Sequence, residues 1–469
     1  MKTNQHLIKP LLPLVQLKPS FLLATAFLLP FSVSAAPSNA LLPDMNATST
    51  LKAPLALQQL DMSQAVKRAI EWNPMITGAT ERTNQQGEEV GFAKSAYYPQ
   101  IKSGIKSSYR DSIGRSEEAL TITGSQLVYD FGKVSSNVEA AQYGVEKYQA
   151  DTLRVIDQLA RETAFAALEV ERYQELVKIA GEQVAGVTDL FDLSKKRSEM
   201  GASTRSDEMQ ARSRVDAALA SELQMVAQLD MWKRTLQNLV GSTTPPSVLP
   251  GAPAVLAQAC SVSIDSLSNV PEIMVAEAQR SEAMANIKAS NAEFYPSITV
   301  DAGMEHYLKE RDRDVLVKKN RRDRNDYTIG VNFNVDLYQG GATTARKRGA
   351  EYALRAADAA KDEALLDISR GLQEAVSQSS TYGQRLSILD SRISSIIETQ
   401  SIYRQQYISL GTRSLLDLLN TEQEIHQARM EKNNTQQDLK RLQIDCLYNT
   451  ASLRGAFALN GYAPMGSNQ

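Results

Sequence analysis

Long stretches of the chain place apolar residues at alternating spacings of three and four positions. The clearest series is Val134, Val138, Ala141, Val145, Tyr148, Thr152, Val155 and Leu159. This spacing keeps one seam of a helix facing a partner, as in a coiled coil. A second series covers 386–410, and proline is absent from 100–244 and 297–463. We therefore expect continuous helices over 133–200 and 342–410, each about 100 Å long at a rise of 1.5 Å per residue.

Four shorter segments alternate apolar and polar residues, which is the period of a β-strand. The clearest is 327–338, and the others are 101–109, 119–129 and 297–307. Each is about ten residues long, the length of a tilted strand that crosses a bilayer. Tyrosine and phenylalanine flank all four segments, as in the aromatic girdles of membrane barrels. Two hairpins on a soluble core are the alternative interpretation.

The chain contains one unit twice, and such duplications decide the fold. Pro74 and Pro271 are 197 positions apart, as are Pro99 and Pro296. The stretch LVYDFGK at 127–133 corresponds to VDLYQGG at 335–341. The proline-rich stretch GSTTPPSVLPGAP cannot continue a helix and separates the two copies.

These patterns divide the chain into six parts. We expect a signal peptide at 1–35, an N-terminal linker at 36–60, a first repeat at 61–240, a proline-rich linker at 241–270, a second repeat at 271–457 and a tail at 458–469. Each repeat would hold a short helix, a β-hairpin (99–129 or 296–338) and a helical hairpin (133–240 or 342–457). The short helices over 61–97 and 272–294 would stack end to end with the return legs of the helical hairpins, completing a second pair of rods.

Two stretches interrupt the helical seams with a shared frame. EMGASTRSDEMQ (199–210) and SLGTRSLLDLLN (409–420) each contain a glycine, then a serine or threonine three positions on and an aspartate six positions on. Glycine inside a helix costs about 1 kcal/mol relative to alanine, so Gly201 and Gly411 are expected to permit hairpin turns. Asp207 and Asp417 would then cap the returning helices, since carboxylates near a helix start accept free N–H groups and oppose the dipole.

The N-terminus has the features of an export signal. Lys2, Lys9 and Lys18 precede the apolar run FLLATAFLLPFSVSA, with a small-x-small pattern at Val33 and Ala35. With 51 basic and 54 acidic residues, the chain has no charge excess that favours nucleic acid. No other stretch approaches the roughly 18 apolar residues of a transmembrane helix, so a membrane role would have to come from strands.

The only cysteines of the sequence are Cys260 and Cys446. Neither lies at the expected cleavage site, so a lipid-modified N-terminal cysteine is not expected. In an oxidising compartment the two thiols could pair or stay separate, and the sequence leaves both alternatives open.

The sequence offers little to an enzyme. It contains no GxSxG, HExxH or Walker loop, and outside the signal its histidines, His306 and His426, fall in different expected elements. We therefore expect no catalytic site, cofactor or metal. A soluble coiled-coil rod of the periplasm is a competing class, but it leaves the strand lengths and flanking tyrosines unexplained.

Four strands cannot close a barrel, and an open sheet edge in lipid leaves backbone groups unsatisfied. Several chains would therefore have to pool their strands, and three chains would supply twelve. The same assembly would gather the helical rods into a cylinder. A tube that is open through a membrane and extends far on one side follows from the duplication.

The expected signal peptide, the Asn73-Pro74 pair, YQGG at 338–341, GTRSLLD at 411–417 and the duplicated strand-strand-helix-helix unit together resemble the TolC family of outer-membrane channel proteins. The resemblance covers about residues 61–457. It implies an α+β membrane protein, a homotrimer with a twelve-stranded outer-membrane β-barrel continuous with a periplasmic α-helical coiled-coil barrel. It also implies an exit duct that works with a periplasmic adaptor and an inner-membrane transporter.

The resemblance assigns the two turns to the periplasmic mouth, where contacts between helices hold the channel shut or meet the adaptor. Carried onto matching positions, the implied gate residues are Ser206, Asp207, Arg413, Asp417 and Asn420. Asn420 departs from the family pattern, which has a second aspartate there, and this weakens any expectation of strong cation capture.

The YQGG and GTRSLLD forms look closer to the type I secretion members, including those that export large surface adhesins. The resemblance therefore implies export of a polypeptide with an inner-membrane ABC transporter. The absence of a cysteine for lipidation separates the chain from one large efflux subgroup. An outer-membrane component of a multidrug or small-molecule efflux pump is the alternative.

Overall fold

The computed structural model describes residues 55–110, 115–261, 267–308 and 325–459. The expected signal peptide, most of the N-terminal linker and most of the C-terminal tail lie outside the described residues. Among the described residues, no helix combines the length and the apolar character needed to cross a membrane.

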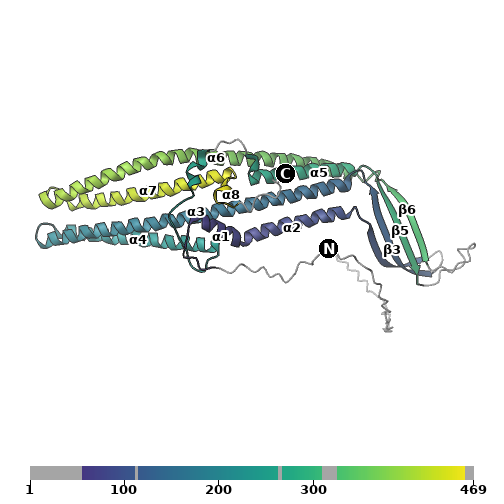
Figure 1. The fold of residues 1–469 in the computed structure, drawn as a ribbon, viewed down its shortest axis with the longest axis horizontal. Coiled ribbons are helices and arrows are strands. Elements are labelled where there is room, and N and C mark those ends of the chain that lie inside the picture. Colours follow the sequence, from purple (N-terminus) through teal and green to yellow (C-terminus); the bar gives the residue numbers. More distant parts are fainter. Residues whose placement is uncertain (1–54, 111–114, 262–266, 309–324, 460–469) are drawn as a thin grey trace, which may run out of the picture. The chain divides into compact units, whose positions relative to one another are not determined.

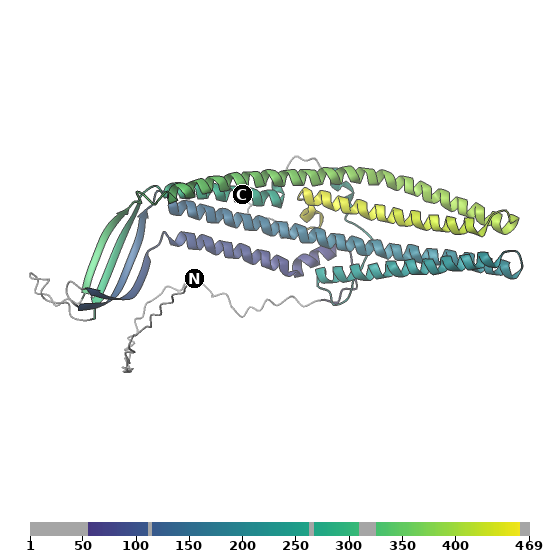
Figure 2. The same ribbon diagram turned by 180° about the vertical axis from the view of Figure 1, so that it is seen from behind.

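Two long helical hairpins form most of the described chain (Figures 1 and 2). The first consists of α3 (Lys133–Glu199) and α4 (Arg205–Val240), and the second of α6 (Ala342–Gln405) and α7 (Leu415–Asn449). Helix α3 also packs against α7, which joins the two hairpins. At 1.5 Å per residue, the 67 residues of α3 span about 100 Å, as the unbroken seam predicted.

The short helices extend the return legs. α1 (Met62–Trp72) meets the end of α4, where Arg68 Nε donates to the Val240 carbonyl at 3.3 Å. α5 (Pro271–Ala292) begins beside the end of α7, where Tyr448 Oη donates to Glu272 Oε1 at 2.5 Å. A last short helix, α8 (Leu453–Ala456), follows α7. The end-to-end arrangement expected from the sequence is therefore present in the described chain (Figure 1).

The helix expected over 61–97 is in fact two helices, because it breaks at Asn73 before α2 (Pro74–Ser95). A residue before proline is pushed out of the helical region, and Asn73 has an extended ψ of 128°. Its side chain then caps α2 by accepting from the Met75 N–H at 3.0 Å. The second helical leg, expected to 457, likewise ends at Asn449, and α8 follows after a turn.

Four antiparallel strands form one sheet in the order β2-β3-β5-β6. They are β2 (Gln100–Arg110), β3 (Arg115–Tyr129), β5 (Ser297–Tyr307) and β6 (Asn325–Asn334). The pairing of β3 with β5 joins the hairpins of the two repeats. The strand expected over 327–338 stops at Asn334, so residues 335–338 were wrongly assigned. Leu337 and Tyr338 are instead 90% and 87% exposed, in the segment that leads to α6.

Both repeats enter their long helix through the same left-handed turn. Phe131 and Gly132 have φ values of 56° and 93°, and Gly340 and Gly341 have 63° and 87°. A phenylalanine rarely adopts positive φ. Here its ring stacks on Tyr295, with centroids 5.3 Å apart. The turn is structural evidence of the duplication.

The proline-rich linker folds onto the middle of the helices. Its strand β4 (Ser247–Val248) pairs in parallel with β1 (Gln59–Leu60), and two 3-10 helices, η2 (Ala254–Ser261) and η3 (Leu267–Asn269), follow. Cys260 of η2 and Cys446 of α7 form a disulfide with Cα atoms 5.3 Å apart. The structure thus contains the pairing that the sequence left open.

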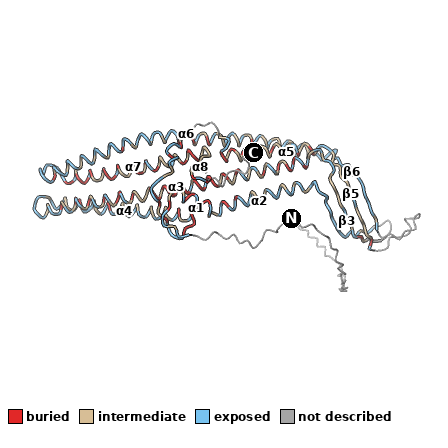
Figure 3. The backbone as a smooth tube through the Cα atoms, viewed as in Figure 1, coloured by how far each residue is buried: buried red, intermediate tan, exposed pale blue. Residues whose placement is uncertain are grey.

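The main core lies at this same level. Buried positions gather where α1, α3 and α8 meet (Figure 3). Ala160, Ala164 and Ala167 of α3 are fully buried there, and small side chains allow helices to approach closely. Phe457 and Leu453 close the cluster from the C-terminal side.

Candidate functional site: the hairpin turns and the open edges

Two equivalent turns end the helical hairpins, and each is built on the same capping box. In the first turn, Asp207 N donates to Thr204 Oγ1 at 3.2 Å, and Thr204 N donates to Asp207 Oδ2 at 3.2 Å. In the second, Asp417 N donates to Ser414 Oγ and Ser414 N donates to Asp417 Oδ2, both at 3.2 Å. The glycine, hydroxyl and aspartate frame of the sequence is therefore a helix-start motif.

The two turn glycines adopt a backbone conformation that other residues rarely adopt. Gly201 and Gly411 have φ values of 73° and 65°, the left-handed region that L side chains rarely adopt. The second hairpin differs in one respect, because a π turn at Gln406–Leu410 separates α6 from Gly411. Such turns are rare in proteins, and those that occur often lie at functional sites.

Arg413 binds mainly to the helix that precedes its turn. Its guanidinium carbon lies 4.2 Å from the centroid of the Tyr403 ring, and its Nε donates to Gln406 Oε1 at 3.0 Å. Its distance to Asp417 is longer, with Nη1 3.9 Å from Oδ2. The cation-π contact and the hydrogen bond thus contribute more to holding Arg413 than the ion pair does.

The remaining candidate residues lie in different surroundings. Ser206 is exposed in the first turn of α4. Asn420 Oδ1 accepts from Arg214 Nη2 at 3.5 Å, a long contact that links α7 to α4 across the two hairpins. The amide at position 420 therefore contacts the first hairpin, which contains Ser206 and Asp207.

Hydrogen bonds surround the carboxylate of Asp207. Ser203 Oγ donates to Asp207 Oδ2 at 2.8 Å, and this hydrogen bond holds the pKa of the Asp207 carboxyl below its ordinary value. The backbone and side chain of Thr204 lower that pKa further. Asp207 is therefore a carboxylate at neutral pH, with its charge fixed at the start of α4.

The tips of the two hairpins share an apolar cluster. It contains Val187, Leu190, Ala211, Tyr407, Leu415, Leu418 and Leu419. Arg197 of α3 lies over the Tyr407 ring at 4.6 Å. The sequence placed Tyr403 and Tyr407 in a helical seam but gave no sign that Arg413 and Arg197 cover their rings, since these contacts depend on how the hairpins pack.

Two sides of the described chain are left open. The sheet ends in the unpaired edges of β2 and β6. α2 and α4 pack on α3, and α6 packs on α5 and α7, so α2 and α4 lie on one side and α6 on the other (Figure 1). Exposed apolar residues mark both sides, including Leu219, Leu223 and Val226 of α4 and Leu366, Ile388 and Ile402 of α6.

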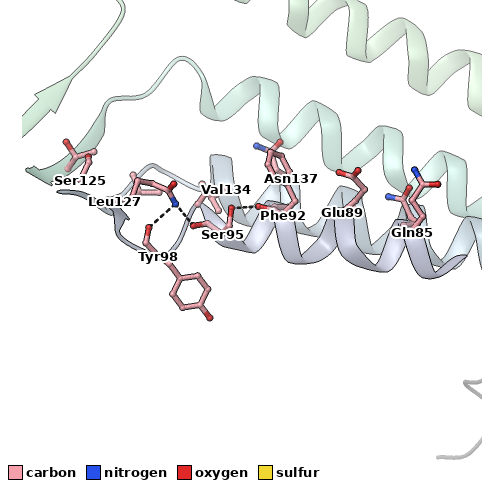
Figure 4. A pocket seen from close by; sticks show the side chains of 15 residues that line it. Gln85, Glu89, Phe92, Ser95, Tyr98, Ser125, Leu127, Val134 and Asn137 are labelled. Atoms are coloured by element: carbon pink, nitrogen blue, oxygen red, sulfur yellow. Dashed lines mark hydrogen bonds between the residues drawn. The ribbon is translucent and has the colours of Figure 1, made fainter. Parts of the chain in front are cut away.

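A hollow of about 810 Å³ lies on the α2 side, close to the sheet. Figure 4 shows Gln85, Glu89 and Phe92 of α2, Leu127 of β3 and Asn137 of α3 along it. Phe92 is 75% exposed. The hollow is therefore open to solvent in the single chain, and the apolar Phe92 side chain lies exposed at it.

Comparison with known proteins identifies the family. The profile described as outer membrane efflux protein matches residues 65–242 and 263–445. The outer membrane efflux protein BepC of Brucella suis biovar 1 (strain 1330) is 25% identical over 383 residues, covering 78% of this chain and 79% of that protein. The outer membrane protein TolC of Vibrio cholerae serotype O1 is 24% identical over 391 residues, covering 81% and 87%. The alkaline protease secretion protein AprF of Pseudomonas aeruginosa is 22% identical over 331 residues, covering 68% and 66%.

A solved structure agrees with the fold. The outer membrane protein VceC of Vibrio cholerae matches with a TM-score of 0.72 and 16% identity, covering 83% of this chain and 95% of that one. The fold expected from the sequence and the resemblance to outer-membrane channels are thus confirmed. The chain belongs to the family of outer membrane efflux proteins.

Proposed function

We propose that this protein is the trimeric outer-membrane exit duct of a type I secretion system. The observation that carries the proposal is that the two open sides of the described chain differ, and that each ends in an edge strand. One side is formed by β2, α2 and α4, and the other by β6 and α6. When two copies meet, one side of the first copy would therefore contact the other side of the second. Such a heterologous contact closes into a ring when its rotation permits.

Closure would remove both structural liabilities of the single chain. An unpaired strand edge is costly in lipid, and pairing β6 of one copy with β2 of the next satisfies it. Three copies bring together twelve strands, a number that encloses a channel. The same contact would seat α6 of a neighbour against α2 and α4, covering their exposed apolar residues and the hollow beside Phe92.

The sheet supports a position in the membrane. On β6, Tyr327, Ile329, Val331 and Phe333 are 68%, 83%, 72% and 64% exposed on one face. The other face has Thr328, Gly330, Asn332 and Asn334. An apolar outer face and a polar inner face are the pattern of membrane barrels around an aqueous lumen.

The helical end would then lie in the periplasm, where it meets an adaptor and, through it, an inner-membrane ABC transporter. Polypeptide cargo is supported by the GTRSLLD and YQGG forms and by the relative named as a protease secretion protein. In this arrangement Arg413, Asp417, Ser206, Asp207 and Asn420 belong to the mouth of the duct, as gate or adaptor contacts.

Loss of the gene tests the cargo. If the duct exports a polypeptide, a deletion strain loses one or more surface or secreted proteins while its sensitivity to detergents, dyes and antibiotics stays as in the parent. Complementation with the wild-type gene restores the missing protein. An unchanged surface and secreted proteome would contradict the proposal.

Small-molecule efflux is the second candidate, since one relative is named an efflux protein. It makes the opposite prediction for the same strain, which would become drug-sensitive with an unchanged secreted proteome. The soluble periplasmic rod considered from the sequence does not agree with membership of a family of outer membrane proteins. Extraction of the protein from membranes by high salt alone would contradict the channel.

A further inference from the structure

Glu422 occupies an unusual place for a charged residue. It lies on α7, five positions beyond Asp417, and is only partly exposed between three helices. Its carboxylate accepts a hydrogen bond from Gln400 Nε2 of α6. On the third side it lies in a notch at Gly186 of α3, where a methyl group in place of the glycine hydrogen would overlap the carboxylate.

Gly186 lies inside α3 with an ordinary helical φ, so the backbone does not need a glycine there to form a turn. Its role is therefore in packing, because it leaves room for the Glu422 carboxylate. Glycine in a helix interior costs about 1 kcal/mol relative to alanine, and a close approach of another chain segment is the usual reason to retain it. Gly181, one and a half turns earlier on α3, is different. A methyl group there would meet Glu222 Oε1 of α4 at 3.4 Å, an ordinary contact.

Other polar contacts continue from this seat away from the tip. Gln183 Nε2 of α3 donates to Gln423 Oε1 at 2.8 Å, and Arg429 Nη1 donates to Glu182 Oε2 at 2.6 Å. Of these three contacts, the one at Glu422 differs because its carboxyl brings α3, α6 and α7 together. It is also the one placed next to the shared apolar cluster of the tips.

We propose that Glu422 is a positioning residue of the gate, whose carboxyl, seated at Gly186 and held by Gln400, fixes the α6/α7 hairpin against α3. The inference rests on the proposed function, because it assumes that the tips form the mouth of a channel. Moving the second hairpin away from the first would empty the notch at Gly186 in all three copies. The Gln400 contact lies within the second hairpin and holds the carboxyl in position for the notch.

The charges around the seat set its pH response. Burial raises the pKa of the Glu422 carboxyl, and the Gln400 hydrogen bond and the nearby Arg429 and Arg404 partly oppose this. Asp189 on α3 raises it further. The seat therefore favours the protonated carboxyl more than water does, so acidification stabilises the packed hairpins and a rise in pH through that pKa weakens their packing.

Single-channel recordings of the full-length trimer in planar bilayers test the proposal. Gly186→Ala fills the notch without changing any charge, and its open fraction is expected to rise about tenfold, the effect of an overpacked contact that costs about 1.4 kcal/mol. Glu422→Gln keeps the shape and the acceptor for Gln400 but cannot ionise. We expect it to stay as closed at pH 8 as the wild type is at low pH. Gly181→Ala is the matched control and should behave as wild type.

The outcomes separate the two proposals. If Gly186→Ala behaves like Gly181→Ala, or if Glu422→Gln keeps the wild-type pH profile, the positioning role is wrong while the channel stands. If the wild-type protein itself forms no pores, the proposed function fails. Trimer bands on unheated gels check assembly, and should Gly186→Ala not assemble, the pH profile of Glu422→Gln still decides.

Discussion

Asp207 and Asp417 show how a short motif can settle local structure and leave function open. Each carboxylate closes a capping box, which accounts for the aspartate six positions after the glycine. Helix capping of this kind contributes about 1 kcal/mol. A gating role requires contacts that change when the tips move. Asn420 has such a contact with Arg214 of the first hairpin. Arg413 instead holds the shape of the second turn through Tyr403 and Gln406, which precede it in the same hairpin.

Replacing Arg413 by alanine is therefore expected to raise single-channel conductance. The change frees the Tyr403 ring and Gln406 and loosens the second turn while leaving the Ser414 and Asp417 capping box intact. Asp417→Ala should raise conductance as well and also lower the melting temperature through the lost cap. Asp61→Ala is the control, since it removes an equivalent cap from α1, away from the tips, and should leave conductance unchanged. Wild-type conductance in both variants of the second turn, with the trimer intact, would leave capping as the whole role of the motif.

A second residue-scale prediction concerns Asp157, which is 1% exposed and accepts from Arg454 Nη1 at 2.8 Å. Burial raises the pKa of this carboxyl to about 7, and the arginine lowers it only in part. In the unfolded chain the group ionises near its ordinary value. The folded state thus holds the extra proton between these values, and this group makes stability fall as pH rises, by about 1.4 kcal/mol per pH unit until about pH 7.

The melting temperature of the helical circular dichroism signal, followed from pH 5 to pH 8, measures this effect. Asp157→Asn cannot ionise and keeps an acceptor for Arg454, so its melting temperature should change less steeply with pH than that of the wild type. Asp445 and Glu169 also have raised carboxyl pKa values and supply part of the remaining slope. Parallel slopes in the two proteins would show that Asp157 does not titrate in this range.

At the scale of elements, the two helical hairpins differ by one residue. The glycines that begin α3 and α6, Gly132 and Gly341, are 209 positions apart, whereas the turn glycines, Gly201 and Gly411, are 210 apart. The second hairpin therefore has one extra residue before its turn. The π turn at Gln406–Leu410 accommodates it, since a wider turn absorbs an insertion without rotating the helix on either side.

Deleting Ile408 should accordingly be tolerated, because it converts the π turn to regular helix and keeps both flanks in register. Ile408 is 48% exposed, so little packing is lost. Deleting Ser395 from the regular part of α6 is the control. It rotates every earlier residue by about 100° relative to the turn and should prevent trimer formation. Unheated gels and thermal melting compare the two, and equal damage from both deletions would refute this account of the π turn.

The sequence predicted those elements whose signals are local. Unbroken seams fixed the long helices, and the strand segments were found by alternation. The strand end at Asn334 was missed because Val335 and Leu337 continue the alternation, while the Gly340 and Gly341 turn decides the geometry. At the site, the glycine and aspartate frame was visible. Tyr403, Gln406 and Arg214 were not, since these contacts arise only when α4, α6 and α7 pack.

At the scale of the whole molecule, a single chain leaves strand edges and apolar helix surfaces that only another chain can cover. Among the residues that the structure describes, β2 and β6 each have one unpaired edge, and α4 and α6 have exposed apolar residues on opposite sides. A soluble monomer with such edges would be prone to aggregation. In the proposed ring of three copies, β6 of each copy pairs with β2 of the next. The apolar residues of each strand then face lipid, and the polar residues that alternate with them face the water-filled lumen.

Neighbouring residues of β6 test that assignment of faces. Ile329 is 83% exposed on the apolar face, so Ile329→Arg would place a charge in lipid at a cost of about 2–4 kcal/mol per chain near the bilayer midplane. Gly330, on the other face, lies opposite Asp301 of β5, and a side chain added there enters open space. Gly330→Arg should therefore assemble, and its charge in the lumen should lower conductance. We expect membrane-inserted trimer, measured on unheated gels of outer-membrane fractions, to fall sharply for Ile329→Arg alone. The reverse order would place the polar face in lipid and exclude the proposed barrel, whereas equal tolerance of both would mean that β6 does not contact lipid.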